Sequence, residues 1–252
     1  MGQYQSIEGD SEDLRQETIE NLEGCYQGTV KDAGWLLYPK AHGEGTMTYK
    51  EGGVYKGSWK DGKRHGQGTM TYVNGDVYEG SWDNDQRHGQ GIYKHHNGDV
   101  YEGLYQNGER HGQGIMKYHS GSVYEGLWEY GRRHGQGIMK YKSGTIYEGQ
   151  WKNNERNGYG KRTTIDGLIY EGQFRNGSFD GKGMAKYANG ATYEGEFKNG
   201  FYCGEGKLTE SDGSFYAGQW KSNQKSGYGL TQSVDGVTTG GYWHYNQKIK
   251  DI

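Results

Sequence analysis

The stretch Val77-Tyr78-Glu79-Gly80-Ser81-Trp82, followed by His88-Gly89-Gln90-Gly91, recurs along the chain and decides its fold. Tyrosine returns every 23 residues, glycine follows it by two positions, and a second aromatic ring follows it by four. Eight such units run from residue 55 to residue 238, and this self-similarity is the signature of a repeat protein. The structural ring columns are Tyr55, Trp59, Tyr78, Trp82, Tyr101, Tyr124, Tyr147, Trp151, Tyr170, Phe174, Tyr193, Phe197, Tyr216 and Trp220.

The segments on either side of the regular repeats divide the chain into four parts. Residues 1–25 form an acidic arm, in which Ser11 to Leu22 predicts a short helix, with a disordered arm as the alternative. Residues 26–54 hold a divergent first repeat that is lengthened by six residues. Residues 55–238 hold the eight full repeats, and residues 239–252 form a half repeat that caps the C-terminal end.

Polar turn dipeptides divide each repeat into two short strands. One turn is Asn74-Gly75 with its counterparts, and the other is Asp61-Gly62 with its counterparts. Both are strong signals for two-residue type I′ hairpins, whose central residues need positive φ. Turns that alternate 13 and 10 residues apart leave room only for short strands. We therefore predict an all-β fold, an elongated single-layer antiparallel meander built from 23-residue hairpin repeats.

The composition indicates what holds such a sheet together. The chain has 48 glycines in 252 residues and 14% aromatic residues, while all hydrophobic residues together reach only 31%. Alternation along a strand places the rings and the repeated glycines on one face. A ring can then lie on the bare backbone of a neighbouring strand, an arrangement known as aromatic rescue. We call this side the ring face and predict that it replaces an aliphatic core.

Repetition and charge exclude several classes of function. Catalysis needs unlike groups at one place, whereas this chain repeats like groups, so we predict neither an enzyme nor a cofactor. The net charge of −3 argues against nucleic-acid binding. Histidines one repeat apart have backbones roughly 10 Å apart, which is too far to share a zinc ion, so no metal site is predicted. These histidines are His65, His88, His111 and His134.

Two charged columns run beside the repeated rings. Because their signs are opposite, we interpret them as facing ladders of solvated ion pairs, each contributing about 0–1 kcal/mol. The columns are Arg64, Arg87, Arg110, Arg133 and Arg156, and Glu79, Glu102, Glu125, Glu148, Glu171 and Glu194.

An aliphatic cluster on the face opposite the rings, together with two nearby rings, is the predicted partner-binding site. Exposed apolar patches of this kind usually mark interaction sites. The alternative is that the N-terminal segment folds back over the cluster. Leu104→Asp combined with Leu127→Asp is expected to abolish partner capture. The predicted site comprises Ile92, Val100, Leu104, Tyr105, Ile115, Val123, Leu127, Trp128 and Ile138.

The segments Tyr78-Glu79-Gly80-Ser81-Trp82 and His88-Gly89-Gln90-Gly91 resemble the MORN (membrane occupation and recognition nexus) repeat, as do their counterparts at 124–128 and 134–137. The resemblance covers nearly everything from Tyr26 to Trp243. It implies a sheet with a groove for a partner polypeptide at cytoskeletal or membrane-associated structures, cilia and axonemes among them. We therefore expect a non-enzymatic cytoplasmic scaffold that binds a helical or extended segment of a protein partner.

Several alternatives stay open beside this expectation. Met1-Gly2-Gln3-Tyr4-Gln5-Ser6 fits the N-myristoylation pattern at Gly2, which favours a phospholipid-binding module at the membrane periphery. The acidic segment that follows opposes attachment to anionic lipid. Stacked rings also suit glycan recognition, although the start of the chain lacks the pattern of a secretory signal. The open edges of the sheet would also allow a homodimer.

Overall fold

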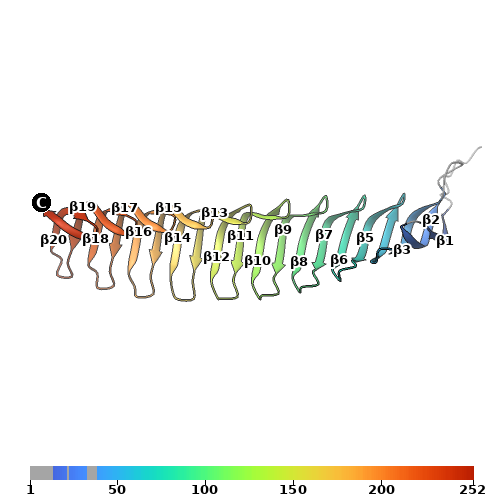
Figure 1. The fold of residues 1–252 in the computed structure, drawn as a ribbon, viewed down its shortest axis with the longest axis horizontal. Coiled ribbons are helices and arrows are strands. Elements are labelled where there is room, and N and C mark those ends of the chain that lie inside the picture. The colour runs from blue at the N-terminus through green and yellow to red at the C-terminus, as the bar shows by residue number, and fades with distance from the viewer. Residues whose placement is uncertain (1–13, 22, 33–38) are drawn as a thin grey trace, which may run out of the picture. The chain divides into compact units, whose positions relative to one another are not determined.

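The computed structural model describes residues 14–21, 23–32 and 39–252, and the chain divides into two compact units, Met1–Arg110 and His111–Ile252. In the first unit, each strand pairs antiparallel with the next strand in the chain (Figure 1). Its strands are β1 (Leu14–Glu20), β2 (Gly24–Lys31), β3 (Lys40–Tyr49), β4 (Val54–Lys60), β5 (Lys63–Thr71), β6 (Val77–Asp83), β7 (Gln86–Lys94) and β8 (Val100–Gln106).

The second unit continues the same antiparallel pattern from strand to strand. The predicted all-β meander of 23-residue hairpins is thus confirmed in each unit. The strands are most of β9 (Glu109–Lys117), then β10 (Val123–Glu129), β11 (Arg132–Lys140), β12 (Ile146–Lys152), β13 (Glu155–Thr163), β14 (Ile169–Arg175), β15 (Ser178–Lys186), β16 (Thr192–Lys198), β17 (Phe201–Thr209), β18 (Phe215–Lys221), β19 (Gln224–Gln232), β20 (Thr238–His244) and β21 (Gln247–Asp251).

The short helix predicted between Ser11 and Leu22 is wrong for the residues that the structure describes there. Leu14 to Glu20 form β1, which pairs along its whole length with β2. A helix of about three turns is marginal without an apolar surface to pack on, whereas a strand obtains hydrogen bonds from the edge of β2. This pairing also means that β1 does not lie over Ile92, Val100 and Leu104, the members of the aliphatic cluster in the same unit. Ser11, Leu22 and Gly2 lie outside the described residues.

No segment within the described ranges forms a helix that is long and apolar enough to cross a membrane.

The ring face is built as predicted, with each column tyrosine lying against glycines of its own and the next strand. A Cβ added at Gly68 would lie 2.2 Å from the Tyr55 hydroxyl oxygen, so glycine is required for the ring to fit. Tyr55 is fully buried, and its hydroxyl donates a hydrogen bond of 3.0 Å to the carbonyl oxygen of Ser58. The same bond to the residue three places on is made by Tyr26, Tyr78, Tyr101, Tyr124, Tyr147, Tyr170, Tyr193 and Tyr216.

The second ring of each repeat connects neighbouring repeats within a unit. The Tyr55 ring meets Trp59 edge-on at 5.1 Å between ring centres and meets Trp82 edge-on at 5.3 Å. The indole nitrogen of Trp82 donates a hydrogen bond of 3.1 Å to the carbonyl oxygen of Gly68. Edge-to-face ring pairs stabilise by about 0.5–1.5 kcal/mol beyond their buried area. Contacts between successive rings therefore stabilise each unit in place of an aliphatic core.

The two kinds of turn differ, and one differs from its prediction. Asp61 and Gly62 both have positive φ, at 52° and 85°, as the predicted type I′ turn requires. At the other turn, Gly75 has a φ of 85° but Asn74 is not among the residues with positive φ. There the Gly75 amide donates to the Tyr72 carbonyl, and the Tyr72 amide donates to the Asp76 carbonyl. This is a three-residue loop, in which only the last residue must be left-handed.

The predicted ladders of arginine–glutamate ion pairs are wrong, because the two columns lie on opposite faces. Arg64 lies on the ring face, with its guanidinium carbon 4.4 Å from the centre of the Trp82 ring. It donates a hydrogen bond of 2.9 Å to the main-chain oxygen of Asp85 in the next two-residue turn. Glu79 is exposed on the other face of β6. Arg87, Arg133 and Arg156 make the equivalent bond to Gly108, Asn154 and Gly177.

Candidate functional site: a groove on the ring face of the first unit

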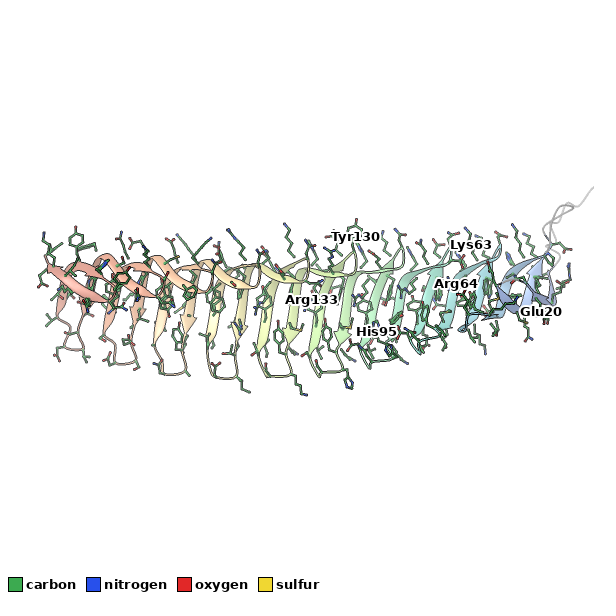
Figure 2. The ribbon with its side chains drawn as sticks, viewed as in Figure 1. Glu20, Lys63, Arg64, His95, Tyr130 and Arg133 are labelled. Carbon is green, nitrogen blue, oxygen red and sulfur yellow. The ribbon has the colours of Figure 1, made fainter. Side chains whose placement is uncertain are left out.

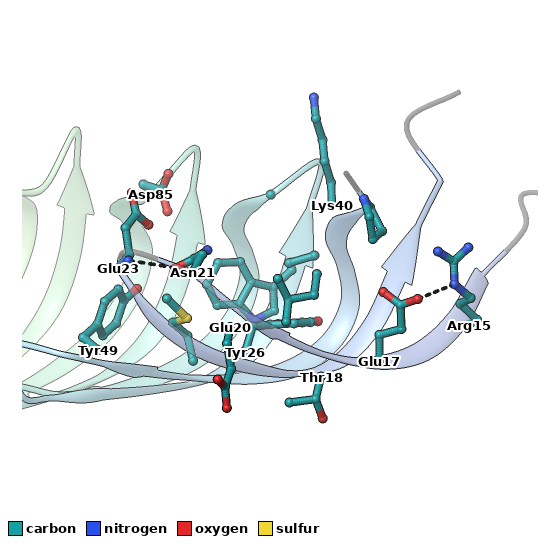
Figure 3. Close-up of a pocket in the computed structure, with 16 residues that line it drawn as sticks. Arg15, Glu17, Thr18, Glu20, Asn21, Glu23, Tyr26, Lys40, Tyr49 and Asp85 are labelled. Carbon is teal, nitrogen blue, oxygen red and sulfur yellow. Dashed lines mark hydrogen bonds and ion pairs between the residues drawn. The ribbon is translucent and has the colours of Figure 1, made fainter. Parts of the chain in front are cut away.

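A groove of about 840 Å³ lies on the ring face of the first unit, over β1 to β4 (Figure 3). Its floor consists of Ile19, Tyr26, Met47, Tyr49 and Trp59. Tyr26, Met47 and Trp59 are buried in the sheet, while Ile19 and Tyr49 are half-buried and offer surface to a ligand. The volume lies within the range of about 300–1,000 Å³ that is usual for ligand sites.

The groove arises where the regular repeat is interrupted. Ile19 lies opposite Tyr26 across β1 and β2, and Met47 lies opposite Tyr26 across β2 and β3, so alternation brings all three side chains to one face. In the regular repeats, a second ring follows the column tyrosine by four residues. After Tyr26 that position is Val30, which is fully buried, and the ring of Trp59 approaches Tyr26 from the other side at 5.4 Å.

One end of the groove carries the carboxylates of Glu23 and Asp85 near the Tyr49 hydroxyl (Figure 3). Arg64 pairs with Asp85, with 3.1 Å between its Nε and the carboxylate oxygen. The carboxylate of Glu23 makes no hydrogen bond or ion pair to another described residue. Burial raises the pKa of Tyr49, Arg64 lowers it, and Asp85 and Glu23 raise it further. This end therefore has one carboxylate more than it has cations.

The other end of the groove is formed by Arg15 and Glu17 on β1. The Arg15 guanidinium pairs with Glu17 at 2.8 Å and with Asp32 at 2.5 Å, so two carboxylates share one cation. Lys40 lies on the rim between the ends and points away from the floor (Figure 3). The groove thus has an apolar floor between two ends that each carry an excess negative charge.

A second polar cluster in the first unit surrounds the buried carboxylate of Asp76. It accepts hydrogen bonds from the Tyr93 hydroxyl at 2.8 Å and the His96 amide at 2.7 Å, and the His96 ring nitrogen Nδ1 lies 2.9 Å away. Burial raises the pKa of Asp76, but the hydrogen bonds from His96 and Tyr93 outweigh it and hold the pKa far below its ordinary value. His95 and Lys63 lie at opposite edges of the first unit (Figure 2). Both oxygens of the Asp76 carboxylate thus have hydrogen-bond partners within the protein. We therefore interpret this cluster as one that stabilises a turn.

The predicted partner-binding residues are spread over both units and alternate with charged or amide side chains. In the first unit, Ile92 lies between Glu79 and Glu102, and Leu104 lies opposite Gln90. Val100 lies opposite Lys94 in the same way. In the second unit, Glu125 lies between Ile115 and Ile138, Val123 lies between Lys117 and Lys140, and Leu127 lies opposite Gln113.

Two of these predicted contact residues are placed differently from the others. Tyr105 and Trp128 are only 4% and 3% exposed, because they belong to the ring face and are packed under neighbouring rings. They cannot contact a partner while the sheet is intact. The seven aliphatic residues on the opposite face are all half-buried, and their role in partner binding stays a prediction.

The histidines of the repeated column do not pair with one another, and two of them lie beside a carboxylate. His65 lies 3.2 Å from Asp83, and His134 lies 3.2 Å from Glu129. Within the described ranges, no group of three or more histidine, cysteine, aspartate or glutamate side chains is arranged to hold a metal ion.

Sequence reasoning missed the groove and the residues that form it. The predicted helix from Ser11 to Leu22 includes Ile19, and Glu23, Tyr49 and Asp85 belong to no motif that indicates a binding site. One signal is present in the sequence, an isoleucine within an acidic stretch.

The fold is that of a repeat protein in which each 23-residue repeat adds one hairpin. The MORN repeat model matches residues 40–54 and eight consecutive segments from residue 55 to residue 238. The matches cover most of the chain, which therefore belongs to the MORN repeat family.

Comparisons with other proteins gave weaker likenesses. A search of curated proteins found no match. Among solved structures, the chain is similar to the TCP10 domain of Danio rerio CPAP in complex with a STIL peptide, at 14% identity, over 83% of this chain and 94% of that chain, with a TM-score of 0.49. It is also similar to the SAS-4 (dCPAP) TCP domain of Drosophila melanogaster with a proline-rich motif of Ana2, at 17% identity, over 73% and 90%, with a TM-score of 0.38.

Proposed function

We propose that this chain is a non-enzymatic scaffold that captures a segment of another protein in the ring-face groove of its first unit. The observation that carries the proposal is an open groove with exposed parts of Ile19 and Tyr49 on its floor and charged side chains around its rim. Apolar floors with a few polar groups at the edge are typical of binding sites. The titratable groups of the groove are carboxylates, cations and tyrosines, which is a set suited to recognition.

A polypeptide suits this groove better than a small molecule does. The groove extends over four neighbouring strands, β1 to β4, so an elongated ligand can contact the apolar floor and the charged ends at the same time. The rim is open along the face of the sheet, which lets a chain enter and leave at its two ends.

The test is a selection from a displayed library of linear peptides with the full chain as bait. Enriched peptides are then titrated against the double variant Ile19→Asp, Tyr49→Ser. We expect their affinity to fall at least about tenfold, since an anchor on the groove floor is lost. Circular dichroism and thermal unfolding check that the variant keeps its fold.

The matched control is Leu104→Asp, which alters the opposite face of the same unit. It should leave peptide affinity unchanged. A selection that enriches no peptide would contradict the proposal. Loss of binding in Leu104→Asp with retention in the groove variant would instead place the site on the aliphatic cluster predicted from the sequence.

We also propose a cytoplasmic location at cytoskeletal, ciliary or membrane-apposed structures, which the family resemblance supports. Imaging of a tagged chain tests the location. The lipid alternative depends on Gly2, so vesicle flotation of the chain and of Gly2→Ala, both produced with an N-myristoyltransferase, separates lipid attachment from protein binding.

A further inference from the structure

We infer that the segment captured by the groove is basic at both ends and apolar in its middle. This inference rests on the proposed function and adds the chemistry of the partner. Glu17, Glu23 and Asp85 bring carboxylates to the groove, whose lining also contains the cations of Arg15 and Lys40, and the floor between them is apolar. A partner that places cations over both ends and an apolar side chain on the floor satisfies every part of this surface.

The acidic end at Glu23 is available for a partner. Asp85 is already paired with Arg64, but the Glu23 carboxylate makes no hydrogen bond or ion pair to another described residue. Glu23 is exposed, so a lysine or arginine can approach it without losing all of its water. Such a rim charge contributes mainly to association rate and to selection among partners.

The end at Arg15 repeats the same imbalance. Arg15 lies between Glu17 and Asp32, at 2.8 Å and 2.5 Å, and both carboxylates keep oxygen atoms that face solvent. A single guanidinium cannot neutralise two carboxylates. A second cation from a partner would complete this group, whereas an acidic partner would meet like charge at both ends.

The spacing of the ends sets the length of the segment. Glu23 precedes β2, and Val30, which lies opposite Arg15, is seven residues further along the strand direction. At about 3.3 Å per residue, the ends are roughly 23 Å apart. An extended chain covers that distance in about seven residues. Ile19, which lies opposite Tyr26, is between the ends and would receive the central apolar side chain, while Tyr49 lies beside Glu23 at one end.

The experiment titrates the full chain with three fluorescent peptides by anisotropy. Each is about seven residues long, with Leu-Phe-Leu in the middle and two lysines, two glutamates or two serines at either end. We expect the lysine peptide to bind at least about tenfold more tightly than the glutamate peptide, and the difference to shrink between about 0.05 M and about 0.5 M NaCl.

A pair of charge-reversal variants locates the effect. Glu23→Arg should weaken the lysine peptide about fivefold or more, because it removes the unpaired carboxylate and adds a repelling charge. Glu79→Arg makes the same change in charge on the opposite face of the same unit and should have no effect. Both side chains are exposed, so neither change disturbs packing.

The other outcomes are distinct from one another. Equal binding of all three peptides would overturn the basic-segment inference and leave the proposed function standing. Tighter binding of the glutamate peptide, no binding of the lysine peptide, or equal weakening by Glu79→Arg would also overturn it. The proposed function is decided separately by the library selection, which does not presuppose charge.

Discussion

At the scale of the residue, the sequence departs from ideal repeat chemistry at a few positions, and Tyr130 is one of them. It occupies the first central position of a two-residue turn, at the turn edge of the second unit, with φ of 47° and 73% exposure (Figure 2). Asp61, Asn107, Asn176 and Asn199 take this position in other repeats. Their short polar side chains tolerate left-handed backbone, whereas a tyrosine there is strained.

We therefore expect Tyr130→Asn to raise the free energy of unfolding by about 0.5–1 kcal/mol, since it relieves backbone strain and removes only an edge-on ring contact with His111, at 6.2 Å between ring centres. Urea unfolding measures the change. Tyr228→Asn is the control, because Tyr228 is also exposed but lies in a strand, where asparagine is the poorer residue. A gain of equal size in the control, or a loss in Tyr130→Asn, would show that backbone strain is not the cause.

At the scale of the element, each hairpin is fixed by what lies on its ring face. Towards the C-terminal end the arginine column ends, and Phe179 and Tyr202 take its positions. Phe179 stacks on Tyr170 at 3.7 Å, and Tyr202 stacks on Tyr193 at 3.6 Å between ring centres. A flat ring thus covers the column tyrosine where a flat guanidinium covers it in earlier repeats.

The glycine opposite each tyrosine is the element's most sensitive position. A Cβ at Gly206 would lie 2.3 Å from the Tyr193 hydroxyl oxygen and 2.6 Å from its Cζ, so the ring would have to leave its place. We expect Gly206→Ala to destabilise the second unit by about 3 kcal/mol, measured by urea unfolding.

Gly240→Ala in the same unit is the matched control. Its added Cβ would meet only the ends of the Leu230 and Tyr228 side chains at 3.3 Å, and both side chains can shift. We expect a change within about 0.5 kcal/mol. Equal tolerance of alanine at Gly206 would contradict the ring-on-glycine account of the sheet.

At the scale of the whole molecule, both units depend on neutral tyrosines. Burial raises the pKa of Tyr26 in the first unit and of Tyr216 in the second to about 12, and it raises the pKa of Tyr55, Tyr147 and Tyr193 further. The ordinary value in an unfolded chain is about 10. The stabilising contribution is therefore complete below about pH 10 and is lost as the pH rises through the folded values.

We accordingly expect the urea midpoint to be unaffected by these tyrosines between about pH 7 and about pH 9 and to fall steeply above about pH 10. Tyrosinate absorbance should show a late-titrating group of tyrosines that ionises together with loss of the circular dichroism signal. Full ionisation of the tyrosines near pH 10 with the fold retained would contradict the burial of the column.

The period of the sequence by itself determined the strands, the faces and the ring-on-glycine contacts, because alternation along a strand and the φ needs of short turns are local properties. The alternating spacing of Tyr78, Gly80 and Trp82 is enough to place all three on one face. The same local reasoning failed at the three-residue turns, since Asn74-Gly75 has the same letters as a two-residue turn and differs only in which amide bonds to which carbonyl.

Only the tertiary structure decided the groove, its charge and the state of the N-terminal arm. Ile19 and Tyr49 are thirty residues apart in the chain, and they share a floor because β1 pairs with β2 and β2 pairs with β3. Glu23 and Asp85 are further apart still. Such contacts depend on which strand edge is free to be paired, and this is a property of the folded neighbourhood that no local pattern carries.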